Sequence, residues 1–325
     1  MRMRVLLGDS VVSQVKSKKS TPVIWLLMGH RGGDNRQLLA LSRRMSSKSG
    51  PIFVEKNIAY NGRHAWPGAV KREDLKAVNL ERSDVLAGPW PDMVIGIGRR
   101  SVPVSRWIKA QSGGKTKIVR LGNPKLDPEF FDLVITTPQY DVRDRSNVMR
   151  MEMPLSDLYD ADLMAEGEKF KHILDGLPKP HIGLIVGGPS WSYDFGKKEA
   201  AILAAQAEAY AKSVGGSLLI TTSSRTPLPC DKVIRENIRT PSYMHMYDGE
   251  TEDNPYRAIL ALSDEVIVTC DSASMISDIL TAKKPILLFE MRNSILSKLG
   301  KSPQKMGRLH RAIIENGHAR WLSKD

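Results

Sequence analysis

The sequence predicts an α/β protein with two doubly wound domains that face each other across a cleft. Its 325 residues exceed the length at which a single hydrophobic core stops growing, so two domains are expected. Short apolar runs alternate with segments of helical spacing in both halves, a pattern typical of parallel sheets flanked by helices. Such sheets bind ligands at the carboxyl ends of their strands, so the cleft is the expected site.

Between the strands of the first half lie segments expected to be helices, such as residues 37–47 and 102–111, where apolar residues recur at helical spacing. Its strands are short apolar runs, most of which end in glycine or a polar turn. They are expected at 23–28, 52–55, 93–97, 117–121 and 133–136, with a further strand at 149–153.

The second half repeats this pattern, with strands expected at 181–186, 217–222, 244–246, 265–269 and 286–289. An alanine-rich helix over 197–213 ends at a glycine pair, a normal C-terminal stop. Pro178 and Pro180 favour an extended connector, so the domain boundary is placed between Asp175 and His181.

Charge is distributed unevenly along the chain. Residues 1–150 hold 27 Lys and Arg against 13 Asp and Glu, a net charge of +14, while the remainder holds 21 against 23, a net charge of −2. A basic half suggests an anionic partner, such as a glycolipid or a membrane surface, although basic residues also serve solubility. Because no run interleaves basic with aromatic stacking residues, no nucleic acid partner is expected.

The chain is divided into a basic tail over 1–20, expected to be mobile, an N-terminal domain over 21–176 and a C-terminal domain over 177–325. No segment is apolar over the roughly 20 residues that a membrane span requires, and no secretory signal pattern follows the tail. Two cysteines build neither a disulfide framework nor a cysteine-rich metal site. We therefore expect a cytoplasmic protein, peripheral at the inner face of a membrane.

A glycine-rich segment after the first expected strand is one candidate site. The candidate residues in this segment are Gly29, His30, Gly32, Gly33, Asp34, Asn35 and Gln37. The glycines let the backbone approach a ligand, here an acceptor, closely. Asp34 and His30 could act as a general base near neutral pH. Alternatively, Asp34 or Asn35 only caps the helix that follows.

Polar segments also follow strands of the second half. The candidate residues for a nucleotide diphosphate are Gly187, Gly188, Ser190, Ser223, Arg225, Met246, Asp271, Ser272, Ser274, Met275 and Asp278. The glycine pair could bring backbone amides to the phosphates, and Arg225 could bind them in bidentate fashion. Asp271 or Ser272 could cap a helix whose first amides face the phosphates, with Asp278 accepting from ribose hydroxyls. Tight turns and solvated loops would explain the same segments without a ligand.

Six segments resemble blocks of the plant mitochondrial-fission (elongated mitochondria) protein family and its bacterial relatives: 29–37, 187–190, 221–227, 254–256, 269–278 and 307–321. The most specific is the D-S-x-S-M-x-S-[DE] block at Asp271–Asp278, together with the N-P-Y at Asn254–Tyr256. The layout of glycine-rich loops and a helix N-terminus followed by a carboxylate also resembles GT-B glycosyltransferases. This resemblance implies two Rossmann-like domains.

The resemblance implies functions of two different classes. The preferred expectation is a metal-independent, inverting glycosyltransferase. It would move a sugar from a nucleotide diphosphate donor to an anionic envelope glycolipid or lipopolysaccharide-type acceptor, without a cofactor. The alternative is a non-catalytic, membrane-associated recruiter of a fission or remodelling protein on the same shell. In the similar transferase of peptidoglycan precursor synthesis, a titratable residue ends the corresponding loop at the place of Asp34, and a carboxylate placed much as Asp278 binds the ribose.

Overall fold

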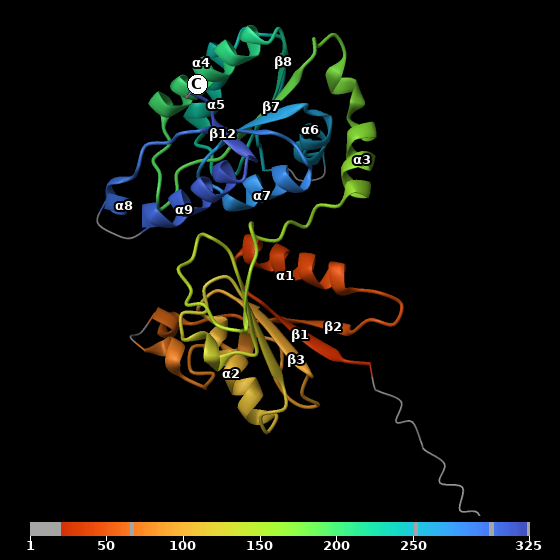
Figure 1. The fold of residues 1–325 in the computed structure, drawn as a ribbon, viewed down its shortest axis with the longest axis vertical. Coiled ribbons are helices and arrows are strands. Elements are labelled where there is room, and N and C mark those ends of the chain that lie inside the picture. Colours follow the sequence, from red (N-terminus) through yellow and green to blue (C-terminus); the bar gives the residue numbers. More distant parts are fainter. Residues whose placement is uncertain (1–20, 66–67, 250–252, 299–301, 324–325) are drawn as a thin grey trace, which may run out of the picture.

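Two α/β lobes lie one above the other in the computed structural model of the chain (Figure 1). The structure describes residues 21–65, 68–249, 253–298 and 302–323. The expected basic tail over 1–20 lies outside these ranges. We call the part that comes first in the chain the N-terminal lobe and the other part the C-terminal lobe.

Within the described residues, the sheet of the N-terminal lobe consists of β1 (Val23–Met28), β2 (Ile52–Asn57), β3 (Met93–Ile97), β4 (Lys117–Leu121), β5 (Leu133–Thr136) and β6 (Val148–Arg150). The strands are parallel, in the order β2-β1-β3-β4-β5-β6. Successive side chains of β1 point to opposite faces. Leu26 therefore packs with helix α1 (Gly32–Met45), and Leu27 packs with helix α2 (Ser101–Gln111) on the other face.

The sheet of the C-terminal lobe, again within the described residues, consists of β7 (His181–Val186), β8 (Ser217–Thr222), β9 (Ser242–His245), β10 (Glu265–Thr269), β11 (Ile286–Phe289) and β12 (Ala319–Trp321). It is parallel, in the order β12-β11-β10-β7-β8-β9, which is the strand order of Rossmann sheets. Every residue of β7 and β8 is buried, as expected for central strands covered on both faces.

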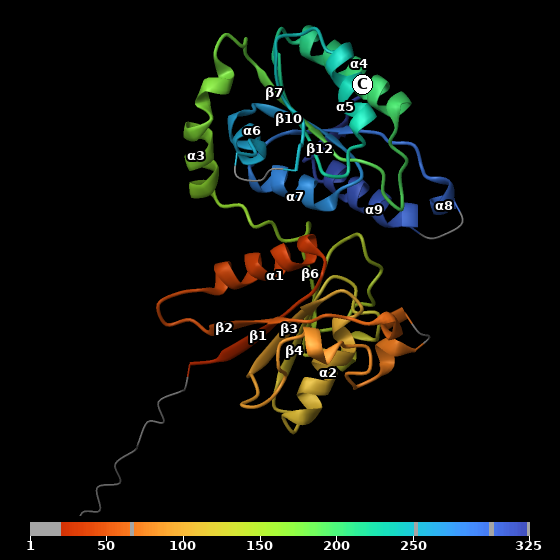
Figure 2. The ribbon, with the colours of Figure 1, turned by 180° about the vertical axis from the view of Figure 1, so that it is seen from behind.

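Helices cover both faces of the second sheet. They are α3 (Asp160–Lys169), α4 (Lys197–Ser213), α5 (Leu228–Asn237), α6 (Tyr256–Leu262), α7 (Ala273–Thr281), α8 (Ile295–Lys298) and α9 (Ser302–Glu315). Helices α1 and α7 face each other between the lobes in both views (Figures 1 and 2). Among the described residues, no helix is long and apolar enough to cross a bilayer.

The predicted fold class is confirmed, and eight of the strands have the predicted bounds. The bounds of helix α4 also match the helix predicted over 197–213, and the remaining elements differ where local signals are weak. Helix α1 begins at Gly32 rather than at residue 37, because glycines and polar residues that resemble a loop form its first turn. Strands β6 and β9 begin one to two residues earlier than expected and end one to three residues earlier, whereas β2 ends two residues later. Strand β12 was not predicted, since three residues at a sheet edge carry little pattern.

The chain passes between the lobes before the boundary placed between Asp175 and His181. Met153, Leu158 and Phe170 belong to the hydrophobic core of the C-terminal lobe. Helix α3 lies beside α6 in both views (Figures 1 and 2). Since the outer face of α3 is acidic and exposed, the stretch resembles a connector in sequence although its apolar residues complete a core.

A pair of fragments tests where the C-terminal lobe begins. We expect residues 151–325 to unfold cooperatively on their own. A fragment of residues 177–325 loses the buried side chains of Met153, Leu158, Leu163, Phe170 and Ile173. At about 1.5 to 3 kcal/mol for each buried side chain, this loss should abolish or strongly weaken the transition in urea, followed by circular dichroism. Equal stability of the two fragments would contradict this assignment.

Candidate functional site

Each sheet has one point where the strand order reverses, and open parallel sheets bind ligands at such points. In the N-terminal lobe this point lies between β1 and β3, and in the C-terminal lobe between β7 and β10. A cavity of about 550 Å³ lies at the first point, and we call it the N-lobe cavity. A cleft of about 890 Å³ lies at the second point, and we call it the interlobe cleft. Gln139, Tyr140 and Lys305 line both spaces, so the two adjoin.

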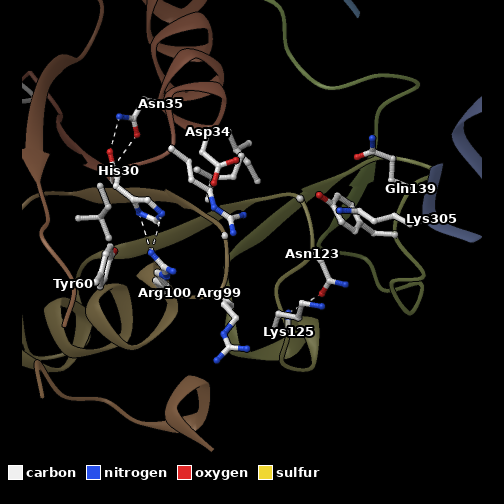
Figure 3. A pocket seen from close by; sticks show the side chains of 18 of the residues that line it. His30, Asp34, Asn35, Tyr60, Arg99, Arg100, Asn123, Lys125, Gln139 and Lys305 are labelled. Atoms are coloured by element: carbon white, nitrogen blue, oxygen red, sulfur yellow. Dashed lines mark hydrogen bonds between the residues drawn. The ribbon is translucent and has the colours of Figure 1, made fainter. Parts of the chain in front are cut away.

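The N-lobe cavity contains most of the predicted acceptor segment. Gly29, His30, Asp34 and Asn35 line it, together with the ends of β3 and β4 (Figure 3). Asn35 joins the end of β1 to α1, because its side chain accepts from the Gly29 amide and donates to the Gly29 carbonyl, both at 2.8 Å. The N-cap of α1 is Arg31 and no side chain caps it, so Asp34 does not serve as the cap.

The remaining residues of this segment face the other lobe. Gln37 lines the interlobe cleft and donates to the Gly33 carbonyl at 3.4 Å. A Cβ atom on Gly33 would lie 3.9 Å from the Ser274 hydroxyl at the start of α7, whereas the corresponding space at Gly32 is open. The first turns of α1 and α7 therefore approach each other across the cleft.

The carboxyl group of Asp34 lies in a mixed electrostatic environment. Burial raises its pKa, while the positive charges of Arg31, Lys305 and Arg120 act in the opposite direction. A Cβ atom on Gly98 would lie 3.4 Å from its Oδ2, so the carboxyl sits against the end of β3. A carboxylate with a raised pKa, beside a cavity, has the properties that a general base requires.

His30 is held by an arginine that follows β3. Nη1 of Arg100 lies 2.9 Å and 3.0 Å from the two ring nitrogens of His30 (Figure 3). A guanidinium only donates, so the ring nitrogen that accepts from it carries no proton. Asp34 faces the cavity without such a direct contact from Arg100, and it is the better placed of the two candidate bases.

Arg120 lies entirely buried behind this cavity and was missed in the sequence. Its Nη1 donates to the Ser101 hydroxyl at 2.8 Å, and its Nη2 donates to the Gly98 carbonyl at 2.6 Å. Burial lowers its pKa to about 10, although Tyr60 and Asp34 favour the charged form. An arginine between the apolar residues Val119 and Leu121 of β4 was the signal that could have identified it.

The interlobe cleft collects most of the predicted nucleotide-binding residues: Ser223, Arg225, Asp271, Ser272, Ser274, Met275 and Asp278. Ser272 is the N-cap of α7, and its hydroxyl accepts from the Met275 amide at 3.4 Å, so the cap is Ser272 rather than Asp271. Arg36 and Gln37 of α1 line the opposite side. Met246 packs against the core of the C-terminal lobe and is not among the cleft residues.

The glycine pair after β7 serves a close approach within the lobe. The amide of Gly187 donates to the Thr269 hydroxyl at 2.7 Å, and the amide of Ser190 donates to the Tyr193 carbonyl at 2.9 Å. A Cβ atom on Gly187 would overlap the Asp271 carboxylate, and one on Gly188 would overlap the carbonyl of Arg225. Packing alone thus requires glycine here, and none of the three residues is among those that line the cleft.

Asp271 and Asp278 both lie buried at the floor of the cleft. Asp271 forms an ion pair with Arg225, with Nη1 and Oδ2 at 2.6 Å, and its Oδ1 has no hydrogen-bond partner among the described residues. Asp278 accepts from Ser156 at 2.6 Å and from Tyr256 at 2.9 Å, and burial raises its pKa. Since Ser156 lies where the chain crosses between the lobes, Asp278 also holds that crossing in place.

The fold and the placement of both cavities define a two-domain α/β protein of the GT-B architecture. Its fold is similar to that of Staphylococcus aureus MnaA bound to UDP, with a TM-score of 0.50 and 12% identity over 92% of this chain and 90% of the other. Acinetobacter baumannii MurG gives a TM-score of 0.49 at 13% identity, over 94% and 87% of the two chains.

The chain belongs to the mitochondrial fission ELM1 family, whose sequence model matches residues 32–325. It is 26% identical to mitochondrial fission protein ELM1 of Arabidopsis thaliana over 289 residues, which cover 81% of this chain and 67% of the plant protein. It is 22% identical to an uncharacterized protein of Rickettsia prowazekii over 306 residues, 82% of each chain. The predicted family membership is thus confirmed.

The packing of the glycine pair leads to a stability prediction. Gly188→Ala places a methyl group on the carbonyl of Arg225, and because backbone must move, we expect a loss of about 3 kcal/mol in the free energy of unfolding. The matched control is Gly32→Ala, where the space is open and alanine suits the helix, so stability should stay within about 1 kcal/mol. Urea unfolding of both variants measures the difference. A tolerated Gly188→Ala would mean that the loop adjusts freely.

Proposed function

We propose that this protein is a metal-independent, inverting glycosyltransferase. The donor, a nucleoside diphosphate sugar, would lie in the interlobe cleft, and the acceptor in the N-lobe cavity. The observation that carries the proposal is the adjacency of two cavities at the two switch points, with Asp34 lining the first and α7 beginning in the second. No resident cofactor is required by this chemistry.

The donor site would use the first turn of α7 and the loop after β8. The N-terminus of a helix carries partial positive charge and free amides, which suit phosphate oxygens. Arg225 reaches the same cleft and is oriented by its ion pair with Asp271. Both groups would stabilise the negative charge that develops on the departing diphosphate. Ser223, Ser272 and Ser274 add hydroxyl groups for phosphate or sugar oxygens.

The reaction would proceed in one displacement. An acceptor hydroxyl oxygen attacks the anomeric carbon as Asp34 takes the hydroxyl proton, and the bond between that carbon and the diphosphate oxygen breaks. The electron pair leaves with the nucleoside diphosphate, and the configuration at the carbon inverts. Burial keeps the pKa of Asp34 above its ordinary value, so its carboxylate is a stronger base than an exposed aspartate.

The acceptor is proposed to be an anionic envelope glycolipid or lipopolysaccharide-type molecule. The supporting observation is the charge of the N-lobe cavity, whose lining includes six Lys and Arg side chains but two carboxylates. Such an acceptor would be reached from the inner face of a membrane, with the protein attached peripherally by the basic surface of its N-terminal lobe.

The base assignment is tested with Asp34→Asn. The amide cannot accept the proton, so turnover should fall about 100-fold or more while donor affinity stays unchanged. In the wild type, kcat/KM should fall as the pH drops through the raised pKa of Asp34, because the protonated carboxyl is no base. Asp141→Asn, at the edge of the same cavity, serves as the control. Unchanged turnover of Asp34→Asn would remove this residue from the mechanism.

The donor site is tested by thermal shift of the purified chain with UDP, GDP, ADP and CMP and their sugars. At a concentration about 100-fold above Kd, one nucleotide should raise the melting temperature by about 3 °C or more. Arg225→Lys keeps a cation beside Asp271 but loses the guanidinium fork, so the shift should shrink. Arg311→Ala, exposed on α9 outside both spaces, should shift as the wild type does.

A second candidate function is a non-catalytic recruiter of a fission or remodelling protein. The name of the plant relative favours this candidate. So do the Gly187 amide and the Asp278 carboxylate, because both already form hydrogen bonds within the chain and would have to exchange them to bind a nucleotide. This candidate expects no stabilisation by any nucleotide in a protein that melts cooperatively. Stoichiometric capture of a protein partner would then support it.

A further inference from the structure

We propose that the N-lobe cavity contains a phosphate-binding subsite, so that the acceptor of this protein is a phosphorylated molecule. Calling that ligand an acceptor rests on the proposed transferase function, whereas the binding of phosphate can be measured without turnover. Three observations carry the inference: the charge of the lining, a buried cation behind it, and a strained lysine at its edge.

Positive charge dominates the lining. The cationic side chains are Arg31, Arg99, Arg100, Lys125, Lys305 and Arg308. The carboxylates of the same lining belong to Asp34 and Asp141. Like charges gathered around one cavity repel one another, and an anion that enters it relieves this repulsion. A ligand with one carboxylate would neutralise little of this excess, whereas a phosphomonoester or a diphosphate carries the required multiple charge.

A further cation, Arg120, is buried behind the wall of the cavity. The contacts of Arg120 are neutral, namely the Ser101 hydroxyl and the Gly98 carbonyl, and its Nε has no partner among the described residues. The titratable groups that face it are Tyr60 and Asp34. A buried charge is costly unless an opposite charge approaches it. Gly98, whose carbonyl accepts from Arg120, also lines the cavity. An anion in the cavity would therefore lie near Arg120, with the Gly98 peptide between them.

The backbone of Lys125 provides the third observation. Its φ angle is 62°, in the left-handed region that favours glycine and asparagine and in which lysine is strained. The Asn123 side chain fixes this turn by accepting from the Lys125 amide at 2.9 Å. Figure 3 shows Arg99, Asn123 and Lys125 along one edge of the cavity. The strained turn thus holds a lysine, rather than the glycine that its backbone favours, at the edge of the cavity.

The arginines of the lining suit phosphate in particular. Arg99 and Arg100 directly precede helix α2 and both line the cavity, so two guanidinium groups reach it from one segment. Arginine binds phosphate oxygens through two parallel hydrogen bonds. The subsite would position an acceptor whose hydroxyl group then faces Asp34.

The test uses the full chain and inorganic pyrophosphate as the probe, measured by isothermal titration calorimetry. We expect binding that weakens with salt, and Lys125→Gly should weaken it about tenfold or more, since it removes one charge-assisted contact. The same variant relieves the left-handed strain, so its melting temperature should stay equal or rise by about 2 °C. Reduced binding with retained stability separates a ligand contact from a structural role.

Lys283→Gly is the matched control, because Lys283 is the other described residue besides glycine with a left-handed φ, at 59°, and it lies outside the cavity. Its affinity for pyrophosphate should equal that of the wild type. Arg99→Ala provides a second variant inside the cavity and should also weaken binding. No binding by the wild type, or equal affinity in Lys125→Gly, would overturn the proposal.

Pyrophosphate could also enter the interlobe cleft, and the Arg225→Lys variant distinguishes the two places. Affinity lost in Arg225→Lys but kept in Lys125→Gly would place the anion in the cleft and overturn the subsite. Binding that depends on Lys125, in a chain that no nucleotide stabilises, would support the phosphate subsite while the transferase proposal fails.

The source of the phosphate is distinguished with vesicles. Phosphatidylcholine vesicles that contain phosphatidic acid expose a phosphomonoester, whereas those with phosphatidylglycerol expose a diester. If the wild type sediments with the phosphatidic acid vesicles and Lys125→Gly does not, the phosphate recognised by the subsite is that of a lipid headgroup. Pyrophosphate binding that depends on Lys125 without such sedimentation would support a soluble phosphorylated acceptor.

Discussion

The arrangement of this molecule depends on two innermost strands, β1 and β7, that are apolar on both faces. In β1, Leu26 and Leu27 face opposite helix layers, and every residue of β7 is buried. A strand of this kind has no room for polar side chains until it ends. Functional groups therefore collect at the carboxyl edges of the two sheets, and the reversal of strand order opens one space in each lobe. The connection through residues 151–156 then brings the two edges together.

The two edges differ in how they offer positive charge. The interlobe cleft combines the N-terminus of α7 with Arg225, whose guanidinium is already paired with Asp271. The N-lobe cavity instead gathers side-chain cations from the ends of β1, β3 and β4 and from α9. Four of these cations, Arg31, Arg99, Arg100 and Lys125, belong to residues 1–150, so part of the net charge of +14 of that segment lies at a cavity. Arg120 shows that this excess extends beneath the surface.

The sequence predicted what local patterns determine. Most strands were predicted within one residue because short apolar runs ended at glycines or polar turns, and Asp34 was found because it followed such a run. Long-range contacts could not be predicted this way. Ser156 lies 122 residues from Asp278, which it binds, and Lys305 enters the N-lobe cavity from the last helix. Gly187 and Gly188 show a further limit. Close packing and the approach of a ligand both require glycine, and the sequence does not distinguish them, whereas the structure shows that the Gly187 amide is already hydrogen-bonded within the chain.

In the proposed mechanism, the charges of the N-lobe cavity would also link the binding of the acceptor to the base, Asp34. Burial raises the pKa of Asp34, and Arg31 and Lys305 partly oppose this effect. A phosphate among the same cations would offset part of their field, so burial would act against less opposition and the pKa of Asp34 would rise further. A carboxylate of higher pKa is a stronger base, provided that it stays ionised at the working pH. The arrangement would therefore strengthen the base when an anionic acceptor is in place, and it would leave Asp34 a weaker base in the empty cavity, where water is the other available nucleophile.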